Sequence, residues 1–402
     1  ETGKRNVSIK IMVEKAALVN FHLLCYTFFV AVCVLQGMKF FKGDRKSMKI
    51  EMKMEICDIV KQFCNEEPKS IEIIDTSRGD ADFREVILAE GASGQKYVIK
   101  LADNDFTFPE KIEMWKRTVE AYRSLGYYCP RIFHDRTGQF PKISYKGHNC
   151  VAYREEYAPY RCVQERGPKM TYETTYLTDI WIMTAKIAGK YLDYGKYSSG
   201  YCLFDTFCPS DEVDEVLENA LSWKEYAETL PEEFTEQVQQ IWQLWMKNRR
   251  ELEQIYHTLP TSVFQADLNP TNLLIDENGK FVGVYDFNLC GKDVFLNYLF
   301  REIYGEDFEP EISRIKEMLQ VVSKYYIFSE SEKKAALMLY RCIKPLWFTK
   351  LHKLKSLEGN TEAIKKHLDE TQKSLTEEID FSAYMSYTCL LYTSPSPRDP
   401  KT

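Results

Sequence analysis

Two carboxylates and one amide have the types and order that phosphoryl transfer requires. Asp267 stands five residues before Asn272, and Asp286 lies further downstream, directly after an apolar run. In phosphoryl transfer one carboxylate orients the attacking hydroxyl and accepts its proton, while an amide oxygen and a second carboxylate hold Mg²⁺ on the nucleotide phosphates. These three side chains are therefore the candidate catalytic group of the chain.

A two-stranded hairpin is expected to position the three side chains. Two apolar runs, Leu273–Ile275 and Phe281–Tyr285, flank the turn sequence D-E-N-G. An Asn-Gly pair between apolar runs is a strong hairpin signal, because both residues tolerate positive φ. Two of the side chains precede the first strand and the third follows the second, so all three should meet at the open end. A surface hairpin whose Asp and Asn residues only make turns is the simpler alternative.

The wider motif resembles that of a known family. The segment Gln265–Asn272 reads QADLNPTN, and Val284–Phe287 reads VYDF. The pair resembles the aminoglycoside phosphotransferase and choline kinase superfamily, which usually has H-G-D-x-x-x-x-N and then a hydrophobic residue, Asp and an aromatic residue. Gln265 replaces the family's His, which is generally structural, and Ala266 replaces its Gly. The resemblance runs from about Ile71 to Leu351 and leaves the subfamily open.

The resemblance implies a fold and a set of roles. The fold would be α+β and protein-kinase-like, with a small antiparallel-sheet N-lobe and a mostly helical C-lobe. Asp267 would be the catalytic base, and Asn272 and Asp286 would be the Mg²⁺ ligands. ATP would lie between the lobes. A structural Asp of the family corresponds to Asp293, for which we expect a bracing role.

The predicted nucleotide-binding half begins with three strand-like runs, Ser70–Thr76, Phe83–Glu90 and Lys96–Ala102. A kinase-type fold places its phosphate-covering loop in the first connection, where Gly79 is the single glycine; a plain hairpin turn is the alternative. The third run contains YVIK, which resembles the V-A-I-K strand whose Lys, here Lys100, pairs with nucleotide phosphates. A lysine on a surface strand is common, but its place ahead of a helix favours the functional interpretation.

Two further features complete the predicted nucleotide site. A helix is expected over Pro109–Leu125, and one of its Glu residues should pair with Lys100. Glu113 and Glu120 are candidates, and Glu113 is preferred. The segment R-E-E-Y resembles the family's hinge, whose main chain holds the adenine while a side chain packs on it. Glu155 and Tyr157 are therefore nucleotide-binding candidates, although Tyr157 could equally belong to the core.

The second half of the chain reads as mostly helical. Helical patterns cover Thr175–Leu192, Pro231–Thr258 and, as one element, Ser331–Leu354. Between the first two, the irregular segment 198–214 mixes aromatic and acidic residues that could bind a cationic amine. A loop packed by its own aromatic side chains is the favoured interpretation of this segment.

The pattern divides the chain into four parts. Residues 48–157 would form the nucleotide-binding N-lobe, and 158–380 the catalytic and acceptor-binding C-lobe. Residues 1–47 would be an uncertain extension that holds the apolar segment 16–38. Residues 381–402 end in YTSPSPRDPKT, fit no element and read as non-native sequence.

The apolar segment Ala16–Met38 is about as long as a membrane-spanning helix. It could be an anchor, a secretory leader or translated sequence upstream of the true start. Leu35-Gln36-Gly37 is a poor cleavage site, which disfavours the leader. Because the chain opens with Glu1 and Met48 precedes ordinary globular sequence, a misplaced start is favoured over an anchor. We expect a cytoplasmic protein, with membrane attachment only if this segment is genuine.

Composition narrows the function. A net charge of −7, without a basic stripe, gives no reason to expect nucleic acid as a partner. The 12 Cys form no C-x-x-C pair and indicate a reducing compartment. We therefore expect an ATP- and Mg²⁺-dependent phosphotransferase acting on a hydroxyl of a small molecule, such as an aminoglycoside, a choline-like amino alcohol or a sugar. A catalytically silent nucleotide-binding or scaffold protein of the same fold is the alternative.

Overall fold

The computed structural model describes most of the chain, namely residues 50–79, 81–163, 176–194, 197–303 and 307–386. Every element of the site lies within one compact unit, which begins at Glu55. The apolar segment 16–38 and the end of the chain, 387–402, lie outside the described residues. Among the described helices, none is long and apolar enough to cross a membrane.

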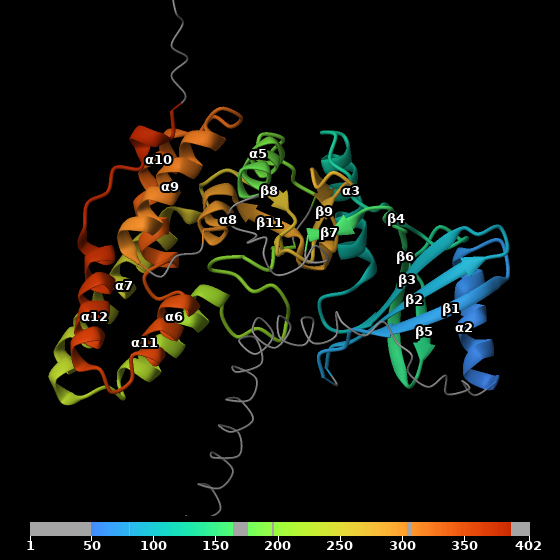
Figure 1. Ribbon diagram of the computed structural model, residues 1–402, viewed down its shortest axis with the longest axis horizontal. Helices are drawn as coiled ribbons and strands as arrows, with labels where there is room; N and C mark the ends of the chain where they lie inside the picture. Colours follow the sequence, from blue (N-terminus) through green and yellow to red (C-terminus); the bar gives the residue numbers. More distant parts are fainter. Residues whose placement is uncertain (1–49, 80, 164–175, 195–196, 304–306, 387–402) are drawn as a thin grey trace, which may run out of the picture. The chain divides into compact units, whose positions relative to one another are not determined.

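The first part of this unit is an antiparallel sheet of six strands (Figure 1). Helix α2 (Ile50–Phe63) precedes it in the chain. The strand order is β1–β2–β3–β6–β4, and β5 pairs with β6 on the side. The strands are β1 (Pro68–Asp75), β2 (Phe83–Gly91), β3 (Lys96–Asp103), β4 (Ile132–Phe133), β5 (Lys142–Tyr145) and β6 (His148–Glu156).

The pleat of this sheet decides which side chains can reach a ligand. In β2 burial alternates strictly, so that Phe83 and Ile87 are buried while Arg84 and Val86 are half-buried. Val86 pairs with Lys100 of β3, and Lys100 pairs in turn with Tyr153 of β6. Directly opposed residues share a face of a sheet. One face therefore carries the half-buried positions of β2 together with Lys100.

The expected helix after the third strand is α3 (Pro109–Arg123). Phe108 is extended and Pro109 occupies the first turn, where a missing N–H costs nothing because that group has no helical partner. Its apolar face is buried and includes Ile112, Trp115 and Tyr122. This helix connects the first three strands to β4.

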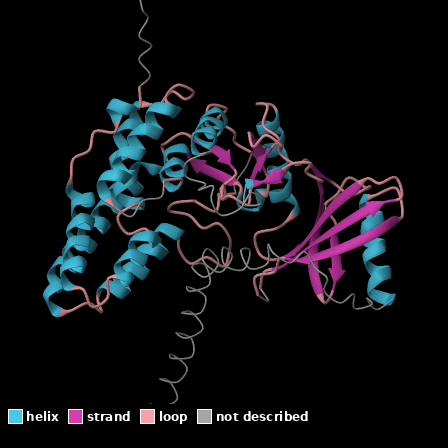
Figure 2. Cartoon of the chain, in the orientation of Figure 1, coloured by secondary structure: helices cyan, strands magenta, loops and turns pink. Residues whose placement is uncertain are grey.

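The second part is mostly helical, as the sequence predicts (Figure 2). One predicted helix is wrong, because Ser331–Leu354 is divided into α10 and α11 around Pro345, whose ring and missing N–H interrupt a helix. The helices are α5 (Leu177–Ala188), α6 (Glu215–Ala227), α7 (Thr235–Tyr256), α8 (Phe295–Arg301), α9 (Phe308–Val322), α10 (Glu330–Ile343), α11 (Phe348–Ser356) and α12 (Thr361–Thr376).

Short strands between α7 and α8 carry the catalytic motif. The predicted hairpin is formed by β9 (Leu273–Ile275) and β10 (Phe281–Val284), and β7 (Arg161–Cys162) pairs with β9. A second antiparallel pair is formed by β8 (Thr261–Phe264), which precedes the hairpin in the sequence, and β11 (Gly291–Val294), which follows it. The architecture is thus α+β, with an antiparallel sheet followed by a helical region, which confirms the predicted fold class.

One close backbone contact joins the hairpin to the connection between α3 and β4. Tyr128 N donates to Val282 O at 2.8 Å, and Val284 N donates to Tyr128 O at 3.0 Å. A Cβ added at Gly283 would lie 1.8 Å from Tyr128 O, so only glycine fits. This contact fixes the hairpin against the segment that follows α3.

Candidate active site

Gln265 braces the loop that carries the candidate base. Its Nε2 lies 2.9 Å from Asp267 O, 3.1 Å from Tyr285 O and 3.0 Å from Asp286 O. Its Oε1 accepts a hydrogen bond from Asp267 N at 2.7 Å. The side chain is fully buried, so these groups could not find water instead. Gln265 thus ties the segment before the hairpin to the segment after it, the structural role that the resemblance gives to the family's His.

Two amides hold the carboxylate of Asp267. Asn269 Nδ2 donates to Oδ1 at 2.7 Å, and Asn272 Nδ2 donates to Oδ2 at 3.0 Å. Burial, and next the carboxylate of Asp286, raises the pKa of Asp267 above its ordinary value, while the amides and Arg78 act in the opposite direction. A fixed carboxylate with a raised pKa is a suitable proton acceptor.

Asn272 is oriented by the same contacts. Its Nδ2 donates to the main-chain oxygen as well as the carboxylate of Asp267, at 2.8 and 3.0 Å. Its main-chain oxygen accepts from Tyr285 N at 3.1 Å, which joins the two ends of the hairpin. Because the NH₂ group points at Asp267, the amide presents its oxygen on the other side, as a cation ligand must.

Asp286 adopts a conformation that non-glycine residues seldom adopt. Its φ is 59° and its ψ is 76°, in the left-handed region, at the start of the short 3₁₀ helix Phe287–Leu289. Such strain persists only where surrounding contacts enforce it, and it is frequent at functional sites. Here the main-chain oxygen is held by Gln265 and the carboxylate is held by Lys100.

Lys100 links the sheet to the catalytic segment. Its Nζ lies 3.2 Å from Asp286 Oδ1 and 3.0 Å from Glu155 Oε2. Burial alone would lower the pKa of Lys100, but the carboxylates of Asp286 and Glu155 raise it well above its ordinary value. The ammonium group therefore stays charged, which suits a residue expected to contact phosphates.

The predicted partner of Lys100 is wrong. Glu113 of α3 contacts His134 Nε2 at 3.0 Å and lies 3.7 Å from Lys116, on a half-exposed face. Glu155 takes the place beside Lys100 because it lies on β6, two residues beyond Tyr153, which is the direct strand partner of Lys100. Residues two apart on a strand point to the same face. The carboxylate that pairs with Lys100 therefore comes from the neighbouring strand β6 and not from helix α3.

This finding also changes the expectation for the hinge. Glu155 lies in β6, and its side chain is only 9% exposed and forms an ion pair with Lys100. Tyr157 follows the strand, is 42% exposed and lies under the ammonium of Lys96, 4.6 Å from the ring centroid. An exposed ring just past the strand remains available to pack against a nucleotide base.

Gly79 lies in the first connection, where it was expected. Its φ is 90°, a value that side chains disfavour, and no atom lies within 4 Å of a Cβ built on it. The glycine is thus required by the turn and not by a crowded neighbour. Arg78, the residue before it, lies close enough to influence the pKa of Asp267.

The segment 198–214 packs against other elements. Two of its acidic side chains have partners within it, because Ser198 Oγ donates to Asp205 and Asp211 accepts from Phe207 N at 3.1 Å, whereas Asp214 is ion-paired with Arg249 of α7. Its aromatic rings contact residues outside the segment, such as Phe207 on Phe106 and Phe204 on Tyr256, so the expected loop packed by its own aromatic side chains is not observed. Asp293 has the bracing position expected for it: its carboxylate accepts from Tyr256 Oη at 3.0 Å and Asn297 Nδ2 at 2.9 Å.

No cluster of three His, Cys, Asp or Glu side chains is found among the described residues. A divalent cation that bridges protein and nucleotide needs fewer protein ligands, because phosphate oxygens complete its shell. Asn272 and Asp286 supply an amide oxygen and a carboxylate, the oxygen ligands that Mg²⁺ prefers. The residues present therefore fit such an ion.

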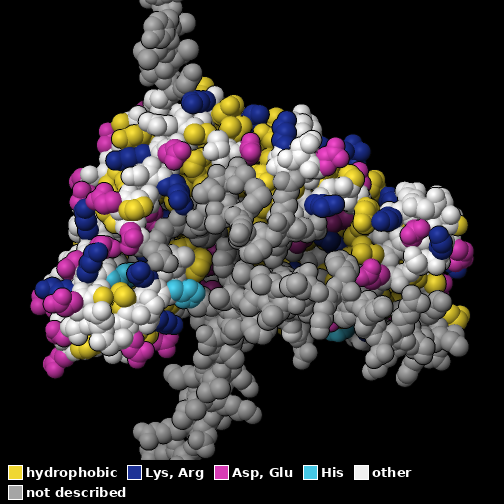
Figure 3. Space-filling model, viewed as in Figure 1, with side chains coloured by type: hydrophobic (Ala, Val, Ile, Leu, Met, Phe, Trp, Pro, Cys, Tyr) yellow, Lys and Arg dark blue, Asp and Glu magenta, His cyan; other side chains and the backbone are white. Residues whose placement is uncertain are grey.

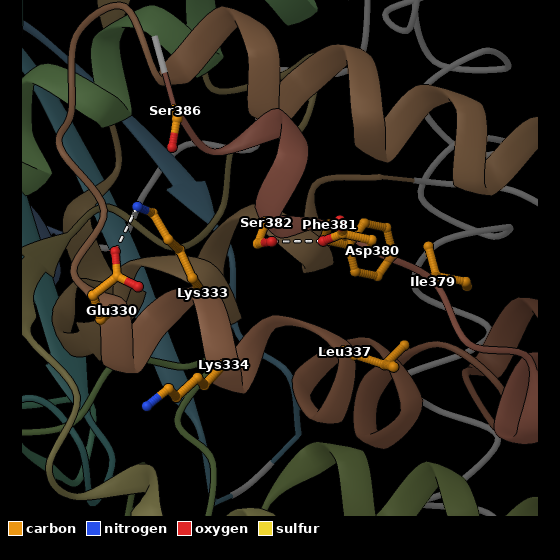
Figure 4. Close-up of a pocket in the computed structure, with 9 residues that line it drawn as sticks. All are labelled: Glu330, Lys333, Lys334, Leu337, Ile379, Asp380, Phe381, Ser382 and Ser386. Atoms are coloured by element: carbon orange, nitrogen blue, oxygen red, sulfur yellow. Dashed lines mark hydrogen bonds and ion pairs between the residues drawn. The ribbon is translucent and has the colours of Figure 1, made fainter. Parts of the chain in front are cut away.

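One surface cavity of the described residues lies elsewhere. It has a volume of about 390 Å³ and is lined by α10 residues such as Lys333 and by the segment Ile379–Ser382 (Figure 4). Glu330 and Lys333 lie three residues apart on α10 and form an ion pair at 2.7 Å. On the face drawn in Figure 3, described side chains of both charges are interspersed and form no basic stripe.

The sequence matches a family model over the catalytic segment. Residues 207–297 match the phosphotransferase enzyme family, APH. This range includes the loop of Asp267, the hairpin and Asp286, and the match confirms the family resemblance that the motif predicted. No curated protein matches the sequence.

The chain is similar to solved structures of small-molecule kinases. A microcompartment-associated aminopropanol kinase has a TM-score of 0.50 and 15% identity, over 80% of this chain and 95% of its own. Amicoumacin kinase, in complex with AMP-PNP and Ca²⁺, has a TM-score of 0.48 and 14% identity, over 84% of this chain and 99% of its own. A macrolide 2'-phosphotransferase from Brachybacterium faecium has a TM-score of 0.41 and 11% identity, over 82% of this chain and 99% of its own. The first likeness shows the kinase-like fold, and the family match covers the segment that carries Asp267, Asn272 and Asp286.

Proposed function

We propose that this phosphotransferase moves the γ-phosphate of ATP, as its Mg²⁺ complex, to a hydroxyl group of a small molecule. The observation that carries the proposal is the meeting of two distant elements. Lys100, from the sheet, lies 3.2 Å from Asp286, and Asp286 is tied through Gln265 to the loop of Asp267. A phosphate-contacting cation, a metal-binding carboxylate and a proton acceptor are thus held in one place.

Asp267 is the proposed base. Its two carboxylate oxygens are fixed by Asn269 and Asn272, so it can orient an acceptor hydroxyl without first losing conformational freedom. As the hydroxyl attacks phosphorus, its proton passes to Asp267. Because the transition state of phosphoryl transfer is loose, positioning and neutralisation of charge supply most of the rate.

Asn272 and Asp286 are the proposed ligands of Mg²⁺, which would neutralise charge on the β- and γ-phosphates. Lys100 would contact the nucleotide phosphates, and Glu155 would keep its ammonium in place. Gly79 would lie in the loop over the phosphates, and Tyr157 would pack against the base. The lobes would correspond to residues 48–157 and 158–380.

Thermal unfolding of the full chain with and without Mg²⁺-ATP tests the nucleotide site. A ligand at ~100 times its dissociation constant stabilises the folded state by ~2.7 kcal/mol, which is a visible shift in Tm. We expect this shift in the wild-type protein only when Mg²⁺ is present, and we expect its loss in Asp286→Ala.

Asp276→Ala is the matched control. Asp276 lies in the turn of the same hairpin and accepts from Asn278 N and Lys280 N at 2.9 Å, away from the nucleotide. This variant should have a lower Tm but the same ligand-induced shift. A wild-type protein that shows no shift would contradict the proposal and favour a silent scaffold. If the shift is present, release of ADP in the presence of candidate alcohols identifies the acceptor.

A further inference from the structure

Arg84 occupies a position at the start of β2 that faces the same way as Lys100. It lies two residues before Val86, the direct strand partner of Lys100, and so shares the face of that lysine. It also lies on the side of Val86 nearer to the loop of Gly79. Any phosphate chain that passes from Lys100 toward the loop would therefore meet the Arg84 side chain.

The guanidinium group of Arg84 is only partly satisfied. Its side chain is 14% exposed, and Nη2 pairs with Asp82 Oδ2 at 3.0 Å. Its Nε is buried without a hydrogen-bond partner among the described residues. A buried N–H without an acceptor is costly, so a phosphate oxygen that reached Arg84 Nε would satisfy it. Asp286 is close enough to stabilise the charged form.

Several main-chain N–H groups of the loop already have acceptors. In other kinase-type sites, backbone N–H groups of a glycine-rich loop contact the phosphates. Here Ser77 N donates to Asp75 Oδ1 at 2.9 Å, Arg78 N donates to Asp82 O at 2.9 Å, and Asp82 N donates to Gly79 O at 3.3 Å. These three N–H groups are engaged within the loop, which contains a single glycine.

Arg78 carries a second guanidinium on the same connection, where its main-chain N–H donates to Asp82 O at 2.9 Å. Its charge acts in the same direction as burial, the larger cause, to lower the pKa of Arg84, and it also acts on the carboxylate of Asp267. Arginine side chains bind phosphate in a forked geometry that suits this arrangement.

We propose that Arg84, assisted by Arg78, binds the terminal phosphates of the nucleotide and takes the place of the backbone N–H groups of a glycine-rich loop. The inference rests on the proposed function and adds a specificity: the site favours a triphosphate over a diphosphate. Lys100, which shares a sheet face with Arg84, contacts Asp286, a proposed ligand of Mg²⁺, at 3.2 Å. The guanidinium is therefore assigned to the Mg²⁺-binding end of the nucleotide.

Affinities of the full chain for the Mg²⁺ complexes of ADP and of the β,γ-imido analogue of ATP, measured by calorimetry, test the inference. We expect Arg84→Gln to weaken binding of the triphosphate by about 10- to 100-fold, the range for hydrogen bonds to charged groups. Binding of ADP should change by less than about threefold, so that the preference for the triphosphate disappears.

Arg341→Gln is the matched control. Arg341 of α10 is 16% exposed, pairs with Glu378 at 2.9 Å and also has a buried Nε without a partner among the described residues. It belongs to the helical part and not to the loop, so both affinities should be unchanged in this variant. Folding of each variant is checked by circular dichroism and Tm.

A purely structural Arg84 gives a different result. If Arg84 only holds the loop through Asp82, Asp82→Asn should weaken the binding of both nucleotides as much as Arg84→Gln does. That result would show that the inference is wrong. It is equally wrong if Arg84→Gln binds the triphosphate as the wild type does. Absence of nucleotide binding by the wild-type protein would instead overturn the proposed function, and this inference with it.

Discussion

Different contacts position the side chains of the catalytic segment, residues 265–286, and those of the nucleotide-binding face, the sheet face that carries Lys100. Within residues 265–286, the polar groups satisfy one another locally: Gln265 holds main-chain atoms on both sides of the hairpin, and two amides hold Asp267. On the sheet, by contrast, Lys100 depends on Glu155 from a strand that follows much later in the sequence. The first region is ordered by sequence neighbours and the second by strand pairing.

This difference explains which substitutions each region tolerates. In the catalytic segment a side chain of another type can take over a role if it offers the same donors and acceptors, as Gln265 does in the position of a histidine. On the sheet a role can move to another strand, because any residue on the right face at the right register can reach Lys100. Glu155 replaces the helical glutamate in this way.

Asp267→Asn should have the largest effect of the variants considered. The amide keeps the shape of the carboxylate but cannot accept the proton of the acceptor hydroxyl, so turnover should fall by about 100- to 10,000-fold. The affinity for Mg²⁺-ATP should change little. Single-turnover kinetics and calorimetry measure the two quantities, and Asp276→Asn is the control. Unchanged turnover would show that the catalytic segment is not the site of chemistry.

A pair of glutamate variants compares the neighbouring strand with the helix. Glu155→Gln should raise KM for ATP by about tenfold or more, because Lys100 loses its charged hydrogen-bond partner. Glu113→Gln should change KM by less than about threefold, since its contacts are half-exposed. Steady-state kinetics with varied ATP measures both. A larger increase in KM for Glu113→Gln than for Glu155→Gln would support Glu113 as the partner of Lys100.

Two variants of Gln265 test the local brace. Gln265→Ala leaves Asp267 N and three main-chain oxygens without their buried partner, so the free energy of unfolding should fall by about 1–3 kcal/mol. Gln265→His introduces a ring that can donate and accept hydrogen bonds, so the free energy of unfolding should fall by less in this variant. Urea unfolding measures both values. Equal loss in the two variants would mean that volume, and not hydrogen bonding, is the contribution of Gln265.

Predictions from the sequence succeeded where the signal was local. The Asn-Gly turn and its flanking apolar runs predict the hairpin β9–β10 correctly, because the turn chemistry and the strand pattern lie within a few residues. Pro109 indicates the start of α3 in the same manner. The family match over 207–297 confirms the motif in that stretch.

Predictions failed where a contact depended on distant residues. Glu113 and Glu120 were chosen on helix position, but the register between β3 and β6 places Glu155 beside Lys100. One failure was local: a single helix over Ser331–Leu354 was predicted from its apolar pattern, although Pro345 was a visible signal for a break. The unpartnered Nε of Arg84 has no signature in the sequence.

The sequence by itself determined the chemical inventory: a carboxylate, an amide and a second carboxylate around a hairpin, and a lysine on a strand ahead of a helix. Spacing along the chain is sufficient for these, because turns and short strands are governed by neighbouring residues. Only the tertiary structure decided the partner of Lys100 and the position of Arg84. These depend on strand register and burial, which bring together residues that the sequence keeps far apart.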